Sequence, residues 1–281
     1  EEGHDYYAVC ADAETGKIRF NQKLFHSDNP EPLGNNVNGY ASCSPCVEDG
    51  KAYIHFGSYG TACLESETGK VIWQRNDMPC RHYRGPGSSP IIWGDLLILT
   101  FDGADLQYLT ALDKKTGKTI WKTDRKTQWK DLQPDGQPIR EGDLRKSFTT
   151  PLVVDNAGAP LLISASSYSV FAYDPKSGKE IWNIRTTGRN AAIRPISKGD
   201  IAYINTGNHL VALKIDANTK GDVTDKELWV REKHNASWSS TVIIGNHLYQ
   251  ADAACVANCV DLGTGKETWS ERVFQSAGKM F

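Results

Sequence analysis

The sequence predicts an all-β fold built from repeated four-stranded units, and three observations support this prediction. One phrase recurs along the chain: a small residue, an apolar residue and usually an acid precede a Thr-Gly-Lys or Ser-Gly-Lys turn, and an aromatic residue follows. A second pattern, a small-residue pair often followed by Pro and an apolar stretch, lies between the copies. No segment of the 281 residues shows a convincing helical period of 3.6 residues.

The first pattern occurs in five good copies, at residues 10–20, 63–73, 111–121, 172–182 and 259–269. A degenerate sixth copy, 212–229, carries an insertion where the Thr-Gly turn should be. The closing aromatic residues are Phe20, Trp73, Trp121, Trp182, Trp229 and Trp269, and the turn glycines are Gly16, Gly69, Gly117, Gly178 and Gly265.

The second pattern predicts the first two strands of each unit. Its anchor residues are Pro45, Pro90, Pro151, Pro195 and Thr241. After each anchor, two β-branched or aromatic runs flank a Gly, Asp or Asn turn, which is the signature of a β-hairpin. Four strands per repeat, with closing aromatic residues 40 to 61 residues apart, predict the blades of a β-propeller.

The repeated residue types have physical roles. Glycine at the turn adopts a positive φ without steric cost, and the Asp and Thr or Ser side chains bond nearby backbone amides. A large Trp at the end of the outer strand would join each blade to the next. We therefore expect replacement of one of these Trp residues by Ala to cost about 3–5 kcal/mol.

The predicted domain is a single propeller over 1–281, with five complete blades and one partial blade. The blades are expected at about 1–25 (partial), 39–77, 86–125, 147–186, 190–233 and 237–274, with a charged insertion at 122–147. Because the first unit lacks two strands, the sequence favours a fragment of a seven- or eight-bladed ring over a six-bladed ring closed between the termini. The signal peptide would then be missing from this fragment.

The phrase A/C-x-D-x-x-T-G-K-x-x-W resembles the pyrroloquinoline-quinone-like, or Trp-docking, β-propeller repeat, and the resemblance covers essentially the whole chain. That family contains quinoprotein alcohol dehydrogenases. It also contains non-catalytic BamB-like scaffolds, such as the lipoprotein propeller of the outer-membrane β-barrel assembly machinery. Residues 80–125 look most like uncharacterised extracytoplasmic bacterial members. The resemblance implies an extracytoplasmic protein, periplasmic or secreted.

The enzyme branch is the alternative interpretation. The resemblance implies that such enzymes often place an adjacent Cys-Cys disulfide and a calcium ion beside the quinone, and this chain has no Cys-Cys pair. Serine-hydrolase, phosphate-loop and zinc-protease motifs are also absent from the sequence. We therefore expect no catalytic residue, no metal and no cofactor, with pyrroloquinoline quinone and calcium as the alternative.

The seven cysteines are interpreted as structural residues. Cys10, Cys63 and Cys259 occupy one repeat position, where the other copies have Ala. Cys43 and Cys46 form a C-x-x-C, but residues three apart on a strand point to opposite faces, so they are not expected to chelate one ion without a bulge. Cys80 has no counterpart in the repeat.

Two segments have a functional and a plain interpretation. Residues 216–227 match parts of a calcium loop, but Lys220 stands at a ligand position and the flanks are strands, so an elongated hairpin turn is favoured. The insertion 122–147 is highly charged and holds a lone Trp129. It is either a recognition loop or a solvated surface hairpin, the latter slightly preferred.

One set of cations is a candidate ligand site. Six residues before each anchor, at the predicted entry to the innermost strand, the chain has Gly39, Arg84, Arg145, Arg189 and Asn235. With the neighbours Arg81, His82, Lys146 and Arg194, these arginines would converge on one mouth of the channel and bind an anion or an acidic peptide. The alternative is that each Arg pairs with a local acid such as Glu141 or Asp143.

The sequence therefore predicts a non-catalytic, extracytoplasmic scaffold that binds a protein or a small anionic ligand at the channel mouth. The net charge of −2 gives no electrostatic reason to expect nucleic acid, and no apolar run is long enough to span a membrane. The oligomeric state is left open.

Overall fold

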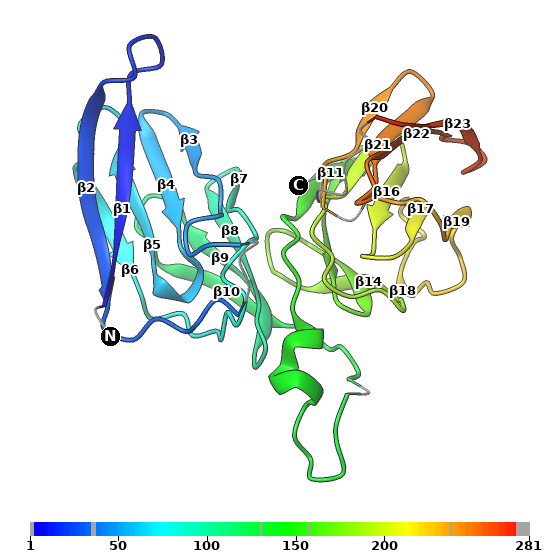
Figure 1. Cartoon of the computed structure of the whole chain (residues 1–281), viewed down its shortest axis with the longest axis horizontal. Helices are drawn as coiled ribbons and strands as arrows, with labels where there is room; N and C mark the ends of the chain where they lie inside the picture. The colour runs from blue at the N-terminus through cyan, green and yellow to red at the C-terminus, as the bar shows by residue number, and fades with distance from the viewer. Residues whose placement is uncertain (1–2, 35–37, 130, 157, 237, 274–281) are drawn as a thin grey trace. The chain divides into compact units, whose positions relative to one another are not determined.

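The structure is a computed structural model that describes residues 3–34, 38–129, 131–156, 158–236 and 238–273 (Figure 1). The chain forms two compact units: unit 1 holds residues 1–126 and 130–143, and unit 2 holds 127–129 and 144–281. The predicted all-β propeller fold is confirmed by five four-stranded antiparallel blades and one two-stranded sheet. The single domain over 1–281 and the size of the ring stay predictions.

Unit 1 contains three sheets. The strands are β1 (His4–Ala11) and β2 (Ile18–Ser27) in the first; β3 (Cys46–Glu48), β4 (Lys51–His55), β5 (Thr61–Glu65) and β6 (Val71–Arg75) in the second; and β7 (Ile91–Trp93), β8 (Leu96–Asp102), β9 (Gln107–Asp113) and β10 (Thr119–Asp124) in the third. Two 3₁₀ segments are η1 (Gly57–Tyr59) and η2 (Ile139–Arg145).

Unit 2 contains the other three sheets. The strands are β11 (Leu152–Asn156), β12 (Ala159–Ser166), β13 (Ser169–Tyr173) and β14 (Glu180–Arg185); β15 (Ile196–Lys198), β16 (Ile201–Asn205), β17 (Leu210–Lys214) and β19 (Trp229–Arg231); and β20 (Val242–Ile244), β21 (His247–Ala251), β22 (Val256–Asp261) and β23 (Glu267–Arg272). A short extra strand, β18 (Gly221–Asp222), pairs with β14 in parallel and widens that sheet to five strands.

The small residue of each repeat lies directly opposite the closing aromatic residue on the neighbouring strand. The pairs are Cys10 with Phe20, Cys63 with Trp73, Ala111 with Trp121, Ala172 with Trp182, Ala212 with Trp229 and Cys259 with Trp269. Cross-strand partners have Cβ atoms only about 5 Å apart, so a bulky residue here would compete with the aromatic ring for space. This explains why Cys and Ala alternate at one position, and Cys63 and Cys259 are indeed buried.

The closing aromatic residue packs on the turn glycine of the next blade. A Cβ atom added to Gly117 would lie 2.8 Å from the Trp73 ring, one added to Gly265 would lie 2.6 Å from the Trp229 ring, and one added to Gly69 would lie 2.7 Å from Phe20. The Trp73 Nε1 donates to the Lys114 carbonyl at 3.0 Å, and the Trp229 Nε1 donates to the Leu262 carbonyl at 2.9 Å. At these positions the aromatic side chain contacts the turn of the neighbouring blade.

One detail of the predicted docking is wrong. Trp73 is the central residue of the five in β6 and Trp229 is the first residue of β19, so the closing aromatic does not lie at the last position of the outer strand.

We expect Gly117→Ala to destabilise the protein by several kcal/mol, and clearly more than Gly94→Ala. Both glycines have a positive φ, 73° and 56°, so Ala pays about 1–2 kcal/mol of backbone strain at either position. Only Gly117 also lies against an indole ring, whereas no atom lies within 4 Å of a Cβ at Gly94. Urea unfolding followed by circular dichroism measures the difference, and equal losses would contradict the packing role of Gly117.

A buried histidine makes the stability of unit 1 depend on pH. The His55 side chain is buried, its Nδ1 lies 2.8 Å from the Thr61 Oγ1, and its ring packs edge-on against Phe101. Burial disfavours the charged imidazolium and lowers the pKa of His55 to about 3 from its ordinary value of 6.5. The folded protein therefore keeps this side chain neutral at pH values where the unfolded chain takes up a proton.

The contribution of His55 to stability is complete above pH 6.5 and is lost as the pH falls toward 3. Between pH 7 and pH 5 we expect the free energy of unfolding to decrease by about 2 kcal/mol from this group. The variant His55→Leu should lack that part of the pH dependence. Urea midpoints of both proteins at the two pH values test the prediction, and an equal pH dependence would contradict it.

Candidate functional site

Arg84 and Arg81, two of the predicted anion-binding residues, already hold carboxylates within unit 1. The Arg84 Nε and NH2 atoms donate to both oxygens of Asp143, at 2.5 and 2.8 Å, and the Asp143 side chain is only 4 % exposed. Arg81 pairs with Glu31 at 3.2 Å and with Glu141 at 3.7 Å. For these two residues the structure has the local acidic partners that were the alternative interpretation.

His82, which the sequence grouped with these arginines, is a buried structural residue. Its Nε2 accepts the backbone N–H of Ser58 at 3.1 Å, and its Nδ1 lies 3.9 Å from the Cys80 sulfur. A Cβ on Gly57 would lie 2.4 Å from the ring, so the chain passes directly over it. This packing explains why a cysteine is present at position 80, which has no counterpart in the repeat. The Cys80 thiol and the His82 imidazole are both buried and pack against each other.

The remaining cations belong to unit 2 and differ in exposure. The Arg145 guanidinium lies 5.4 Å from the centre of the Trp129 ring, and Trp129 contacts Tyr168 edge-on. Lys146 is buried, with its ammonium 5.0 Å from the Phe148 ring.

Arg189 and Arg194 are exposed, and no ion pair forms at either side chain within the described part of the chain. They lie on either side of Ala191 and Ile193, two buried residues that fix this stretch of backbone. Convergence of the arginines on one channel mouth stays a prediction.

Asn235 and Gly39, the two uncharged residues in the predicted ring of six-before-anchor positions, contact their own loops. The Asn235 amide nitrogen donates to the Arg231 carbonyl at 2.8 Å and to the Asn208 carbonyl at 3.2 Å. The Gly39 N–H donates to the Ser42 hydroxyl at 3.1 Å. These bonds shape the entry loops of the inner strands.

All seven cysteines are free thiols. The Cys46 sulfur donates to the Pro90 carbonyl at 2.8 Å, so this thiol joins two adjacent inner strands instead of facing Cys43. Across the described ranges no three His, Cys, Asp or Glu side chains come close enough to hold a metal ion.

Residues 216–227, which resemble a calcium loop in sequence, connect two blades of unit 2. We call this segment the strap. Its start is the capped turn that the sequence predicted, with the Asn218 N–H donating to the Asp216 carboxylate at 2.8 Å. Its middle was missed: β18 pairs with β14, and the Val223 N–H donates to the Asn183 carbonyl at 2.9 Å. The signal available in the sequence was Val223, an apolar residue in an otherwise polar insertion.

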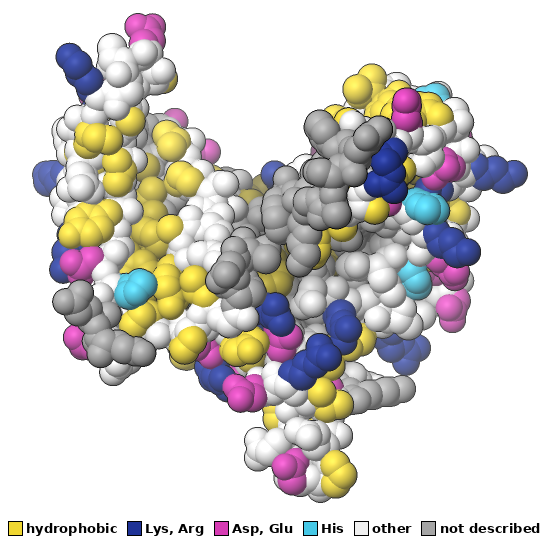
Figure 2. All heavy atoms as spheres, viewed as in Figure 1, with side chains coloured by type: hydrophobic (Ala, Val, Ile, Leu, Met, Phe, Trp, Pro, Cys, Tyr) yellow, Lys and Arg dark blue, Asp and Glu magenta, His cyan; other side chains and the backbone are white. Residues whose placement is uncertain are grey.

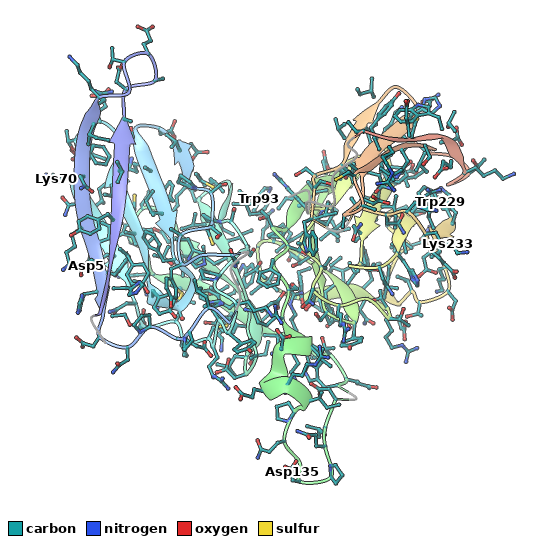
Figure 3. All side chains as sticks on the ribbon, viewed as in Figure 1. Asp5, Lys70, Trp93, Asp135, Trp229 and Lys233 are labelled. Atoms are coloured by element: carbon teal, nitrogen blue, oxygen red, sulfur yellow. The ribbon has the colours of Figure 1, made fainter. Side chains whose placement is uncertain are left out.

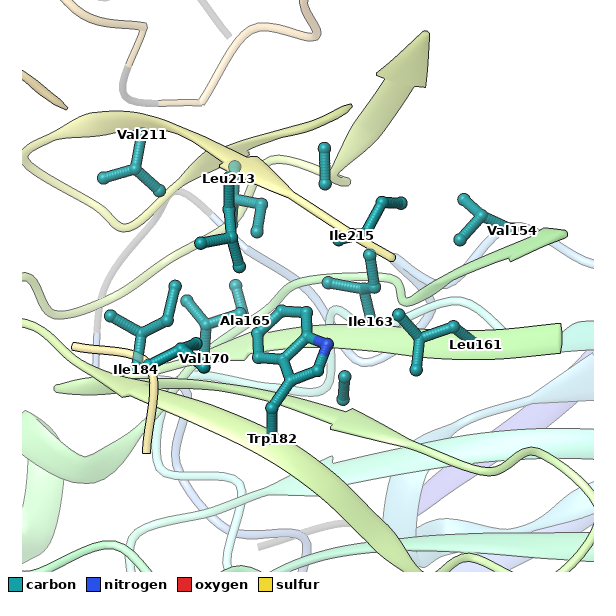
Figure 4. Packing of buried hydrophobic residues seen from close by; sticks show 14 of the residues in the cluster. Val154, Leu161, Ile163, Ala165, Val170, Trp182, Ile184, Val211, Leu213 and Ile215 are labelled. Atoms are coloured by element: carbon teal, nitrogen blue, oxygen red, sulfur yellow. The ribbon is translucent and has the colours of Figure 1, made fainter. Parts of the chain in front are cut away.

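The strap covers the largest core cluster of unit 2. Val223 packs in one cluster with Ile215 and Trp182, whose side chain is completely buried (Figure 4). Trp182 differs from Trp73 and Trp229 because its Nε1 has no hydrogen-bond partner among the residues that the structure describes. The insertion after Ile215 replaces the turn whose carbonyl accepts the indole N–H in the other blades.

The charged insertion 122–147 is only partly a surface hairpin. Residues 131–139 form the hairpin, with Leu132 bridged to Pro138 and Asp135 near the tip (Figure 3). Its first residues complete β10, and its base makes a left-handed turn in which Arg140, Glu141 and Gly142 have φ values of 50°, 55° and 85°. A Cβ on Gly142 would lie 2.2 Å from the Ala104 carbonyl oxygen, so the turn is fitted closely to its blade.

The exposed part of this hairpin carries apolar side chains. Figure 2 shows hydrophobic atoms on the surface of the projecting loop, and Leu132 is 59 % exposed. Ile139 is also exposed.

Loss of the Arg84–Asp143 pair should loosen the hairpin base. We expect Arg84→Ala to raise hydrogen exchange of the amides in 131–145 by about tenfold or more, because it leaves a buried carboxylate without its bidentate partner. The matched control is Arg81→Ala, which removes longer and more exposed ion pairs. Unchanged exchange in the Arg84 variant would show that the hairpin is held by other contacts.

A pocket of about 420 Å³ lies beside β1 in unit 1. It is lined by His4, Asp5, Tyr6, Tyr7, Gly39, Tyr40, Ala41, Ser42 and Phe56. Aromatic rings in its lining meet edge to face. The ring planes of His4 and Tyr40 are inclined at 76°, and those of Tyr6 and Tyr40 at 81°. Of the residues that line this pocket, repeat alignment singled out only Gly39; the others come from β1, from the loop after Gly39 and from Phe56 after β4.

Comparison with known proteins identifies two groups of relatives. A model of the family described as outer membrane protein assembly factor BamB matches residues 6–128 and 122–271. The outer membrane protein assembly factor BamB of Yersinia pestis is 25 % identical over 232 residues, which are 82 % of this chain and 53 % of that protein. The quinohemoprotein alcohol dehydrogenase ADH-IIG of Pseudomonas putida is 26 % identical over 164 residues, 56 % of this chain and 21 % of the enzyme.

Solved structures support the fold. BamB from Moraxella catarrhalis superposes with a TM-score of 0.67 at 19 % identity, covering 97 % of this chain and 73 % of that one. The Pseudomonas putida quinohemoprotein alcohol dehydrogenase ADHIIG gives 0.55 at 16 % identity, covering 83 % and 42 %. The chain spans about half or less of the length of the curated relatives it matches.

Proposed function

Because this chain belongs to the family described as outer membrane protein assembly factor BamB, we propose that it is a non-catalytic, extracytoplasmic scaffold that binds other proteins. The observation that supports the scaffold role is coverage. The assembly-factor relative aligns with 82 % of this chain, whereas the dehydrogenase relative aligns with 56 % and leaves most of the enzyme unmatched. In the part of the chain that the structure describes, no helix is long and apolar enough to cross a membrane.

Two surfaces suit such a scaffold. One is the hairpin 131–139, a projecting element with an exposed Leu132 on a base held by the Arg84–Asp143 pair. Loops on a rigid propeller can vary without cost to the core, which is why recognition concentrates there. The other is the rim of unit 2 around Arg189 and Arg194, where free guanidinium groups are available for a carboxylate or phosphate of a partner.

The scaffold role is tested in a bacterial strain that lacks the full-length protein. We expect reduced amounts of folded β-barrel proteins in the outer membrane, restored by the wild-type gene. Restoration should be weaker with a variant whose Leu132 and Ile139 are replaced by Ser, and complete with a control in which the exposed Lys176 and Lys179 are replaced by Ala. Unchanged outer-membrane protein levels in the deletion strain would contradict the proposal.

The anion-binding rim has its own test. Calorimetry with a poly-glutamate peptide is expected to give binding that Arg189→Ala combined with Arg194→Ala weakens at least about tenfold, while the Lys176 and Lys179 control binds as the wild type does. Equal binding by both double variants would remove these arginines from the site.

The dehydrogenase relatives define the competing outcome. Titration of the chain with pyrroloquinoline quinone and calcium, followed by a dye-coupled alcohol oxidation assay, is expected to give neither binding nor turnover. Tight binding with turnover would overturn the non-catalytic role. Binding without turnover would make the protein a quinone-binding scaffold, which the proposal also does not allow.

A further inference from the structure

The Arg189 side chain carries a charge that the described part of the chain does not neutralise. It occupies the same repeat position as Arg84, six residues before the anchor proline. Arg84 is paired with the buried carboxylate of Asp143, whereas Arg189 is exposed and forms no ion pair with the residues that the structure describes. At this repeat position one cation is therefore held by a local acid, and the other is available to a ligand.

The backbone that carries Arg189 is held in place by the neighbouring blade. A Cβ atom on Gly188 would collide with the Thr206 carbonyl oxygen, and one on Gly207 would collide with the Arg189 carbonyl oxygen. These two close approaches join the loop after β14 to the turn after β16. Because the main chain at Arg189 is already fixed, little conformational entropy of this loop is lost when a ligand binds.

An aromatic residue lies beside this loop in a strained backbone conformation. Tyr168 is in the two-residue turn between β12 and β13, and its φ of 60° lies in the left-handed region, which is rare for a bulky residue. Its N–H donates to the Gly188 carbonyl at 2.7 Å, so its main chain adjoins the residue before Arg189. Glycine would form this turn without strain. A tyrosine held in this conformation points to a role for its side chain.

A second aromatic ring extends the surface beside Tyr168. The rings of Trp129 and Tyr168 meet edge to face, with their centres 6.1 Å apart and their planes inclined at 79°. The Arg145 guanidinium lies 5.4 Å from the centre of the Trp129 ring and orients that ring. Both aromatic side chains are half-buried. Such a pair offers ring faces and edges against which a further aromatic ring can pack.

We propose that Arg189, Tyr168 and Trp129 bind an acidic peptide segment that contains an aromatic residue. The Arg189 guanidinium pairs with a carboxylate of the peptide, and the aromatic side chain of the peptide packs on the rings of Tyr168 and Trp129. All three residues belong to unit 2. This inference rests on the anion-binding rim of the proposed function and names the class of ligand that the rim takes.

Two synthetic peptides of equal charge test the site by calorimetry. One has the sequence Glu-Glu-Trp-Glu-Glu and the other Glu-Glu-Ala-Glu-Glu, both with blocked termini. The wild-type protein is expected to bind the Trp peptide at least about tenfold more tightly than the Ala peptide. Arg189→Ala should weaken the binding of both peptides by about tenfold, because each loses its charge-assisted hydrogen bonds.

Variants of Tyr168 separate the role of the ring from the role of the turn. Tyr168→Phe keeps the ring and should keep the preference for the Trp peptide. Tyr168→Gly relieves the left-handed strain, so its urea midpoint should equal or exceed that of the wild type. Its preference for the Trp peptide should nevertheless fall below about twofold, while the Ala peptide binds as before. A tyrosine that served the turn alone would leave the preference unchanged.

Tyr7→Ala is the matched control, because it removes an exposed tyrosine from unit 1 and should leave both affinities unchanged. The inference is wrong if the wild type binds both peptides equally or if the preference survives in Tyr168→Gly. It is also wrong if a single-stranded oligothymidylate binds more tightly than the Trp peptide, since arginine beside aromatic rings also suits nucleic acid. Binding of both peptides without preference would leave the anion-binding rim in place, and the deletion strain tests the scaffold role separately.

Discussion

Trp182→Ala is expected to lower the free energy of unfolding by about 4 kcal/mol. The side chain is completely buried in the core cluster of unit 2 (Figure 4), beneath the strap, and truncation leaves a cavity that the surrounding strands cannot close. Val223 belongs to the same cluster, so hydrogen exchange in the strap should also increase. Urea unfolding followed by circular dichroism measures the loss.

The conservative variant separates packing from hydrogen bonding. Trp182→Phe and Trp73→Phe remove similar volumes, but only Trp73 donates a hydrogen bond, to Lys114 at 3.0 Å. We expect the Trp73 variant to lose about 1 kcal/mol more from this bond, offset in part by the shallower burial of Trp73. A larger loss for Trp182→Phe would mean that packing outweighs the indole bond.

Asp102→Ala is expected to cost about 3–5 kcal/mol. The carboxylate accepts two bonds from Arg125, from Nε at 2.7 Å and from NH2 at 2.9 Å, and both side chains are at most 1 % exposed. Removing the carboxylate takes two charge-assisted hydrogen bonds from a buried guanidinium. The same urea measurement applies to this variant.

Two control variants test whether the loss of stability comes from burial of the ion pair. Asp124→Ala removes an exposed ion pair with Lys122 and should cost less than about 1 kcal/mol. Replacing Asp102 by Leu and Arg125 by Met together should recover part of the loss, because neither charge of this buried pair remains. A small effect of Asp102→Ala alone would show that Arg125 reaches water or another acceptor when its partner is absent.

The regular parts of this fold could be predicted from the sequence because each blade is specified locally. The Asp-x-x-Thr-Gly turn is formed by hydrogen bonds within five residues, as between Thr116 and Asp113. The same residue types recur at this turn in the other repeats. The docking of Trp73 on Gly117 follows once blades are placed side by side. Alternating apolar residues then fix which face of each strand is buried.

The candidate site could be predicted only in part, because its charged residues form ion pairs with residues far away in the sequence. Arg84 pairs with Asp143, 59 positions later, and Asp102 pairs with Arg125 across two strands. Repeat alignment identifies equivalent positions, but the repeat contains no counterpart of the insertion that supplies Asp143. The strap was missed for a related reason: β18 bonds a neighbouring blade, and a two-residue strand has no recognisable period.

The pairing of each closing aromatic residue with a small residue across the strand, and at three junctions with a glycine on the next blade, has an evolutionary consequence. A segment that encodes one blade carries both the ring it offers and the turn it receives, so duplication or loss of a blade leaves every surviving junction chemically unchanged. Blade number can therefore drift among descendants while the joint is inherited. The strap is an exception, because Val223 and β18 fit one particular neighbour, and the two blades it ties together must be copied or lost as a pair.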